Sequence, residues 1–162
     1  MSSAATEAEI ELPRAGLLRR LAALLYDMFL VAAIWMLLGF ILQLIIGTDN
    51  NQIIDGQVIT DPMVNNLLFF LMLTSSFSFY CWFWMRSGQT LGMLAWRLRA
   101  DSLDGGRLKM PQAIIRFFIA WPAFLLLGAG FLWLYLDKQG DTIHDKVSRS
   151  KIVIVPKSYR PF

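Results

Sequence analysis

The sequence predicts an all-α polytopic membrane protein with two full transmembrane helices, a broken or re-entrant third hydrophobic segment and a small cytoplasmic β element. Two observations support this fold class. The 162 residues are 56% hydrophobic, with a mean hydropathy of +0.51. Their apolar runs are too long, and carry too few charges, for the core of a soluble domain of this size.

The first predicted span covers residues 17–46. Between Leu21 and Gly47 only Asp27 and Gln43 have strongly polar side chains. About 20 apolar residues cross a hydrocarbon core of about 30 Å, so this run can cross with some tilt. Residues 1–13 are polar and acidic, unlike the basic start of a signal peptide. We therefore expect a flexible tail followed by a retained transmembrane helix.

Residues 47–63 form an acidic connector without Lys or Arg, which predicts a position outside the cytoplasm. Turn and β-branched residues around Asp55-Gly56 favour a short hairpin in it. The second predicted span, residues 64–85, follows. The small polar residues of this span favour close helix packing, with a ligand-lining face as the alternative; they are Thr74, Ser75, Ser76 and Ser78.

Residues 86–111 carry five basic residues, and this predicts a cytoplasmic loop. Alternating apolar and polar residues indicate a strand near Trp96, and Asp104-Gly105-Gly106 indicates a turn. Residues 107–109 are the expected partner strand. We therefore predict a cytoplasmic hairpin within residues 95–110.

Residues 112–136 are apolar except for Gln112 and Arg116, but Pro122 and glycines 128 and 130 interrupt them. Six basic residues follow this segment. A single crossing would place them outside, against the positive-inside tendency. We favour a re-entrant or kinked helical hairpin, which is tolerated where protein covers the backbone. A single span is the alternative.

Residues 151–155 form a β-branched run that Pro156 ends, as is typical of a strand. A lone short strand is not stable, so we expect it to share one small sheet with the 95–110 hairpin. The chain then has a single membrane domain over residues 14–156 and a C-terminal tail over residues 157–162.

Two charged residues inside the apolar runs, Asp27 and Arg116, are candidate functional residues. Asp27 lies about 9 Å into the first run at 1.5 Å per residue. A charge at that depth normally has a partner, and Arg116 enters the third segment to a comparable depth. We therefore predict a buried Asp27–Arg116 ion pair, which either serves function or fixes helix packing.

Gly16, Arg20, Ala23 and Asp27 follow one another at steps of four, three and four, so they share one stripe of the first helix. Arg20 and Asp27 are about 10 Å apart along the helix axis, too far for an easy direct pair. Arg20 is therefore expected to extend to the cytoplasmic head groups, as an interfacial anchor or as a functional group.

The composition argues against several kinds of site. Cys81 is the only cysteine and His144 the only histidine, which excludes an intrachain disulfide and a multi-histidine metal site. No nucleophile elbow, phosphate-binding glycine loop or zincin motif is present. We expect no catalytic, cofactor-binding or metal-binding residues and no enzyme activity. His144 is expected at a surface or interface beside a carboxylate.

The net charge of +3 and the pI of about 9.2 need a different explanation from nucleic-acid binding. In a membrane protein, basic residues usually mark the cytoplasmic flanks of the spans. We therefore expect contact with the lipid bilayer and no nucleic-acid partner.

Several motifs combine along the chain: the Arg20 and Asp27 stripe, Gly88-Gln89-Thr90-Leu91-Gly92, Asp104-Gly105-Gly106, Arg116, and Thr142-Ile143-His144-Asp145 with its following strand. From Ala15 to Val155 the chain resembles the RDD family of small bacterial membrane proteins. That family is named for one arginine and two aspartates, which the resemblance assigns to Arg20, Asp27 and Asp145. Met93 stands where many members carry a basic residue, which argues against an anion-binding role for the glycine-containing segment.

The resemblance implies transport of unidentified ligands, including ion or proton exchange, in the bacterial inner membrane. Our leading functional hypothesis is transport or ion translocation with Asp27 as the charge-bearing group. The alternative is a non-catalytic accessory or assembly subunit of a larger membrane complex. Because two or three spans enclose little by themselves, we expect a homo-oligomer or another membrane-protein partner. Both termini are expected in the cytoplasm.

Overall fold

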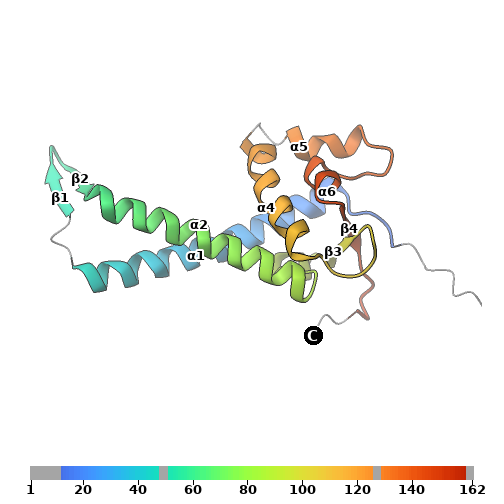
Figure 1. Ribbon diagram of the computed structural model, residues 1–162, viewed down its shortest axis with the longest axis horizontal. Coiled ribbons are helices and arrows are strands. Elements are labelled where there is room, and N and C mark those ends of the chain that lie inside the picture. Colours follow the sequence, from blue (N-terminus) through green and yellow to red (C-terminus); the bar gives the residue numbers. More distant parts are fainter. Residues whose placement is uncertain (1–11, 48–50, 126–128, 160–162) are drawn as a thin grey trace, which may run out of the picture.

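The computed structural model describes residues 12–47, 51–125 and 129–159. Most of the predicted N-terminal tail, glycine 128 of the third segment and residues 160–162 of the C-terminal tail lie outside these ranges. Two long helices run side by side in opposite directions, and the shorter elements gather at one end of the pair (Figure 1). The fold is mainly helical, with two small antiparallel sheets.

The two long helices are α1, Leu17–Ile46, and α2, Pro62–Arg86. Each is long and apolar enough to cross a membrane. α2 begins two residues before the expected span because Pro62 suits the first helical position and Asp61 accepts a hydrogen bond from the backbone N–H of Met63 (2.7 Å). The indole of Trp35 on α1 donates to Ser76 on α2 (3.0 Å), so this small polar residue contributes to helix packing. Ser76 also lines the cavity described below.

A β-hairpin joins the long helices at the end opposite the shorter elements (Figure 1). β1, Asn51–Ile54, pairs antiparallel with β2, Gln57–Thr60, which confirms the predicted hairpin. Asp55 and Gly56 both have positive φ angles, 51° and 76°. A two-residue turn of this kind requires that conformation at both positions, and Gly56 adopts it without steric cost.

After α2 the chain forms α3, Leu91–Ala95, then β3, Leu98–Ser102, and α4, Met110–Leu125. α4 contains Pro122. α5, Ala129–Leu132, a 3-10 turn over Trp133–Tyr135, and α6, Ile143–Val147, complete the helical part. α5 contacts both α4 and α6, and α6 packs on α4. The chain therefore returns to α4 before it enters the last strand.

The last strand, β4, Ser150–Ile154, pairs antiparallel with β3, so that Ala100 lies opposite Ile152. Pairing between the 95–110 region and the tail strand is thus confirmed, but the predicted hairpin within 95–110 is wrong. Residues 107–109 are not a strand; instead the Arg107 guanidinium donates to the carbonyl of Ser87 and to the Tyr159 hydroxyl. The other edge of β4 is occupied by residues 13–15, through an isolated bridge from Arg14 to Val153.

A hydrophobic core forms where the start of α1, the end of α2, the start of α4 and the β3–β4 sheet meet. It includes Leu98, Phe117 and Ile152, and Cys81 is buried in it as a packing residue. Outside this core, α1 exposes large apolar side chains such as Phe29 and Phe40. Exposed apolar surface of this kind on a helix that can span a membrane implies contact with the lipid bilayer.

Candidate functional site

A fully buried carboxylate, Asp145, lies between two arginines. Arg20 on α1 donates to one of its oxygens and Arg116 on α4 donates to the other, in each case through Nη1. The exposed fractions are 6% for Arg20, 4% for Arg116 and 0% for Asp145. This three-residue ion cluster therefore joins the first helix, the third hydrophobic segment and the C-terminal part of the chain.

The local structure around α6 explains the position of Asp145. Its carboxylate accepts a hydrogen bond from the backbone N–H of Thr142 (3.1 Å), three residues earlier, at the start of α6. Burial acts to raise the pKa of Asp145, but the guanidinium groups of Arg116 and Arg20 hold that pKa well below its usual range. Asp145 is therefore ionised at any physiological pH.

Arg20 does not extend toward head groups, so the expectation of an exposed anchor is wrong. Besides Asp145, its side chain donates to the carbonyl of Ala15 (2.8 Å) and to the carbonyl of Gly140 (3.3 Å). The face of α1 that carries Arg20 lies against the protein, because residues 13–15 pair with β4 and the carbonyl of Gly140 contacts the guanidinium, whereas Leu18 on another face is exposed. Arg20 thus has protein partners on several sides.

Asp27 does not pair with Arg116, so the predicted ion pair is also wrong. Its two oxygens accept hydrogen bonds from the backbone N–H of Gly92 (2.8 Å) and from the Thr90 hydroxyl (2.5 Å). Both donors lie at the start of α3, where backbone N–H groups lack helical partners and favour a carboxylate. Within the described ranges Asp27 makes no ion pair, and Arg116 uses its charge on Asp145 instead.

Gly92 makes this contact geometrically feasible. A Cβ at this position would collide with the backbone oxygen of Ala23 and would lie 2.9 Å from the Asp27 carboxylate. α3 can therefore approach α1 only with glycine here. The predicted stripe of α1 is correct for Arg20, Ala23 and Asp27, which are all buried, whereas Gly16 is the exposed residue that precedes the helix.

His144 is buried, with 4% exposure, rather than at the surface. Its Nε2 atom lies 3.0 Å from the Thr142 hydroxyl and 4.0 Å from the Asp145 carboxylate, so the predicted carboxylate neighbour is present. Burial, and next the charge of Arg116, lower the pKa of His144 to about 3. The imidazole is therefore neutral at physiological pH.

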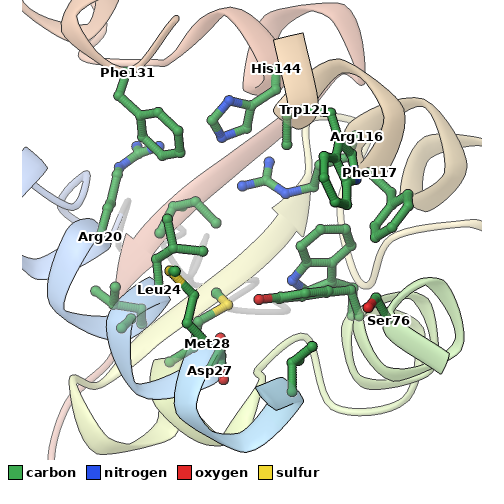
Figure 2. A pocket seen from close by; sticks show the side chains of 18 of the residues that line it. Arg20, Leu24, Asp27, Met28, Ser76, Arg116, Phe117, Trp121, Phe131 and His144 are labelled. Carbon is green, nitrogen blue, oxygen red and sulfur yellow. The ribbon is translucent and has the colours of Figure 1, made fainter. Parts of the chain in front are cut away.

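A cavity of about 400 Å³ lies beside the ion cluster. It is bordered by α1, α2, α4 and the β3–β4 sheet, and its walls are mainly apolar, with residues such as Leu24, Met28 and Phe117. Arg116 and His144 lie on one side of it and Asp27 on the opposite side (Figure 2). The structure therefore brings Arg20, Arg116 and Asp145 together. Asp27 lies apart from this cluster, on the wall of the cavity opposite Arg116.

Two contributors to the site, Thr90 and Gly92, were absent from the candidate residues. The signal was present in the sequence, because a threonine two residues before a glycine at the start of a short apolar segment is typical of a helix cap with a close backbone approach. Thr90 does cap α3, accepting a hydrogen bond from the backbone N–H of Met93 (3.2 Å).

Searches of the curated proteins and of the solved structures gave no significant match. The model of the RDD family matches residues 14–149, a range that includes every charged residue of the ion cluster as well as Asp27. Because this match covers most of the chain, the protein belongs to the RDD family.

Proposed function

We propose that this RDD-family protein is a multi-pass transporter of the bacterial inner membrane, and that the cavity between α1, α2 and α4 is its solute or ion site. The cavity itself carries the proposal. Its volume of about 400 Å³ falls in the range of about 300–1,000 Å³ typical of small-molecule sites. It adjoins two helices long enough to span a membrane, and charged residues line it.

Asp27 is the charge-bearing group in this proposal. Among the described residues it has no basic partner, so a proton or a cation can neutralise it without first breaking an ion pair. Asp145, by contrast, is held ionised by two arginines and is better suited to fixing the helices in place. Ionisable residues at membrane depth are functional candidates by default.

We also propose that both termini face the cytoplasm. The 47–63 connector has no basic residue, whereas the 86–111 loop and the C-terminal part are rich in them. Pairing of residues 13–15, β3 and β4 in one sheet supports a common side for these three segments. The segment 112–136 then enters the membrane and returns.

The test is flux into liposomes that contain the purified protein and an entrapped pH-sensitive dye. Imposed Na⁺ or K⁺ gradients should change the internal pH only when the protein is present, and Asp27→Asn should reduce the rate. Asp104→Asn, in an exposed loop, is the matched control and should retain the full rate. Rates equal to those of protein-free liposomes for every gradient would refute ion translocation.

A second candidate is a non-catalytic accessory or assembly subunit, and the β1–β2 hairpin favours it. This hairpin extends beyond the ends of the long helices (Figure 1) and exposes Ile53 and Ile59 by 78% and 47%. Exposed apolar side chains on such a projection suit contact with another membrane protein or a second copy. Purification in mild detergent tests this candidate, because a stable partner should co-purify with the wild type and be lost from Ile53→Ser.

A further inference from the structure

Among the residues that the structure describes, the ion cluster beside the cavity carries one positive charge that its single carboxylate does not offset. Arg20 and Arg116 contribute two positive charges and Asp145 contributes one negative charge, while His144 is neutral. The neighbouring Arg14–Asp141 pair cancels itself, with 3.2 Å between the charged groups. A buried charge without a counter-charge is unfavourable unless a partner approaches it.

Asp27 does not supply that counter-charge. It lies on the opposite side of the cavity from Arg116 and His144 (Figure 2), and both of its oxygens accept hydrogen bonds from α3. The excess positive charge is therefore localised at the Arg116 end of the cavity.

Three buried nitrogen atoms at this cavity have no hydrogen-bond partner in the described part of the chain. They are Nε of Arg116, Nδ1 of His144 and Nε1 of Trp84, and all three residues line the cavity. The Thr142 hydroxyl can donate to Nε2 of the neutral His144, which leaves the proton on Nδ1. Arg116 and Trp84 are adjacent, with the guanidinium 5.1 Å from the indole ring centre. Buried donors are normally paired, so unpaired donors beside an excess positive charge indicate an anionic acceptor.

The rest of the cavity has the opposite character. Leu24, Met28, Val31 and Trp121 form apolar walls along α1 and α4. A hydrophilic anion alone would leave this apolar surface without contacts, whereas a hydrocarbon chain would cover it.

We infer that the cavity binds an amphipathic anion, an apolar chain that ends in a carboxylate or phosphate group. The anionic group contacts Arg116, His144 and Trp84, and the chain lies against Met28 and Trp121. This inference rests on the proposed function in that it takes the cavity as the solute site, and it names the class of solute. Its test measures binding without any gradient, so that binding without cation-driven flux refutes only ion translocation and flux without binding refutes only this inference.

The experiment uses tryptophan fluorescence of the full chain in nanodiscs of zwitterionic phosphatidylcholine. Three of the six tryptophans line the cavity: Trp35, Trp84 and Trp121. Dibrominated stearate, whose bromine atoms quench tryptophan on contact, should give saturable quenching. Its methyl ester has the same chain without the charge and should bind about tenfold more weakly or worse, because the buried donors and charge then stay unpaired. Equal saturable quenching by acid and ester, or only linear quenching by both, would overturn the inference.

Two variants locate the bound chain. Ala120 lines the cavity, and Ala120→Phe fills it without changing any charge. Ala33 on α1 is exposed and does not line the cavity, so Ala33→Phe is the matched control. Saturable quenching should be lost in Ala120→Phe and retained in Ala33→Phe, and retention in both would overturn the inference. If Ala120→Phe does not fold, the comparison of acid and ester in the wild type still decides.

Displacement identifies the head group. Decanoate and decyl phosphate are added to the protein that already holds dibrominated stearate, with acetate and inorganic phosphate as chainless controls. Displacement by decanoate supports a carboxylate ligand and displacement by decyl phosphate supports a phosphate ligand. Displacement by neither, or displacement by the chainless anions as efficient as by the chain-bearing ones, would overturn the inference.

Discussion

Arg20 and Asp145 are 125 residues apart in the sequence and form a buried ion pair. The second oxygen of the same carboxylate accepts a hydrogen bond from Arg116, so one carboxylate holds together three segments that are distant in the sequence. Removing one member of a buried ionic group is far more costly than breaking an exposed pair, because the remaining charges stay buried without a partner. Asp145 therefore links α1, α4 and α6 through two buried ion pairs.

Asp145→Asn should destabilise the protein strongly, since it leaves two buried guanidinium groups side by side. Breaking a buried pair typically costs about 3–5 kcal/mol. We expect a large fall in the apparent Tm, measured in detergent, and a lower folded yield. The control is Asp104→Asn, which removes an exposed pair with Arg149, 48% and 71% exposed, and should cost at most about 1 kcal/mol. An equal fall in Tm for the two variants would contradict a stabilising role for the buried ion cluster.

Arg116 should couple energetically to Asp145 and not to Asp27. In a double-mutant cycle of Arg116→Gln with Asp145→Asn, the double variant should be more stable than the sum of the single effects predicts, by about 0.5–3 kcal/mol. The same cycle with Asp27→Asn should be additive within about 0.5 kcal/mol, because Asp27 binds α3 instead. Urea unfolding of the purified variants measures both cycles. Strong energetic coupling between Arg116 and Asp27 would show that these two residues interact directly, contrary to the structure.

The part of the fold that local sequence determines was predicted well. The two long helices follow from hydropathy alone, and the β1–β2 hairpin follows from the turn-forming residues Asp55 and Gly56. The pairing of the tail strand with the 95–110 region was also predictable, because a strand as short as β4 requires a partner.

Partner choice within the site was not predictable from local pattern. Helical spacing correctly placed Arg20 and Asp27 on one face of α1, but a periodic pattern identifies a face and not what packs against it. The sequence favours a pair between Asp27 and Arg116 because both interrupt apolar runs at similar depth. Asp145 lies outside any apolar run, so depth gave no reason to consider it, although α6 carries it into the interior beside Arg116.

Gly92→Ala should disrupt the packing of α3 on α1. The added Cβ would collide with the backbone oxygen of Ala23 and press on the Asp27 carboxylate. Overpacking of this kind typically costs about 1–3 kcal/mol, and a backbone atom cannot move aside as a side chain can. Gly16→Ala is the matched control, because nothing lies within 4 Å of a Cβ there. Thermal unfolding should show a clear loss for Gly92→Ala and little change for Gly16→Ala; the reverse order would contradict the close approach.

Stability should fall as the pH decreases from 7 to 5, and His144 should be a principal cause. Its pKa is lowered from 6.5 to about 3 in the folded protein, first by burial and then by Arg116. Between these values the unfolded chain binds more protons than the folded one, so acid favours unfolding. Below pH 6.5 one such proton changes the free energy of unfolding by about 1.4 kcal/mol per pH unit, which amounts to about 2 kcal/mol between pH 6.5 and 5.

His144→Gln should flatten this pH dependence, as measured by Tm at each pH. The Asp145 carboxylate does not contribute in this window, because its pKa is lowered and its stabilising effect is lost only below the ordinary value of 3.8. Burial raises the pKa of Asp141, and a raised carboxylate pKa changes stability with pH in the opposite direction to His144. An unchanged pH profile in His144→Gln would show that the imidazole is not buried in its neutral form.

The loop after β3 and the C-terminal part should face the same side of the membrane, opposite to the β1–β2 hairpin. β3 and β4 form one antiparallel sheet, so their flanking residues cannot lie on different sides while this sheet exists. Single cysteines at the exposed positions Asp104, Lys157 and Gln57 test this with a maleimide that does not cross membranes, since the native Cys81 is buried.

In intact cells only Gln57→Cys should react, and Asp104→Cys and Lys157→Cys should react once the membrane is permeabilised. β3 precedes residues 112–136 and β4 follows them. This result therefore requires residues 112–136 to enter the membrane and return to the side from which they entered. Reaction of Lys157→Cys together with Gln57→Cys would instead make residues 112–136 a single span. The β3–β4 pairing would then have to be absent in the membrane.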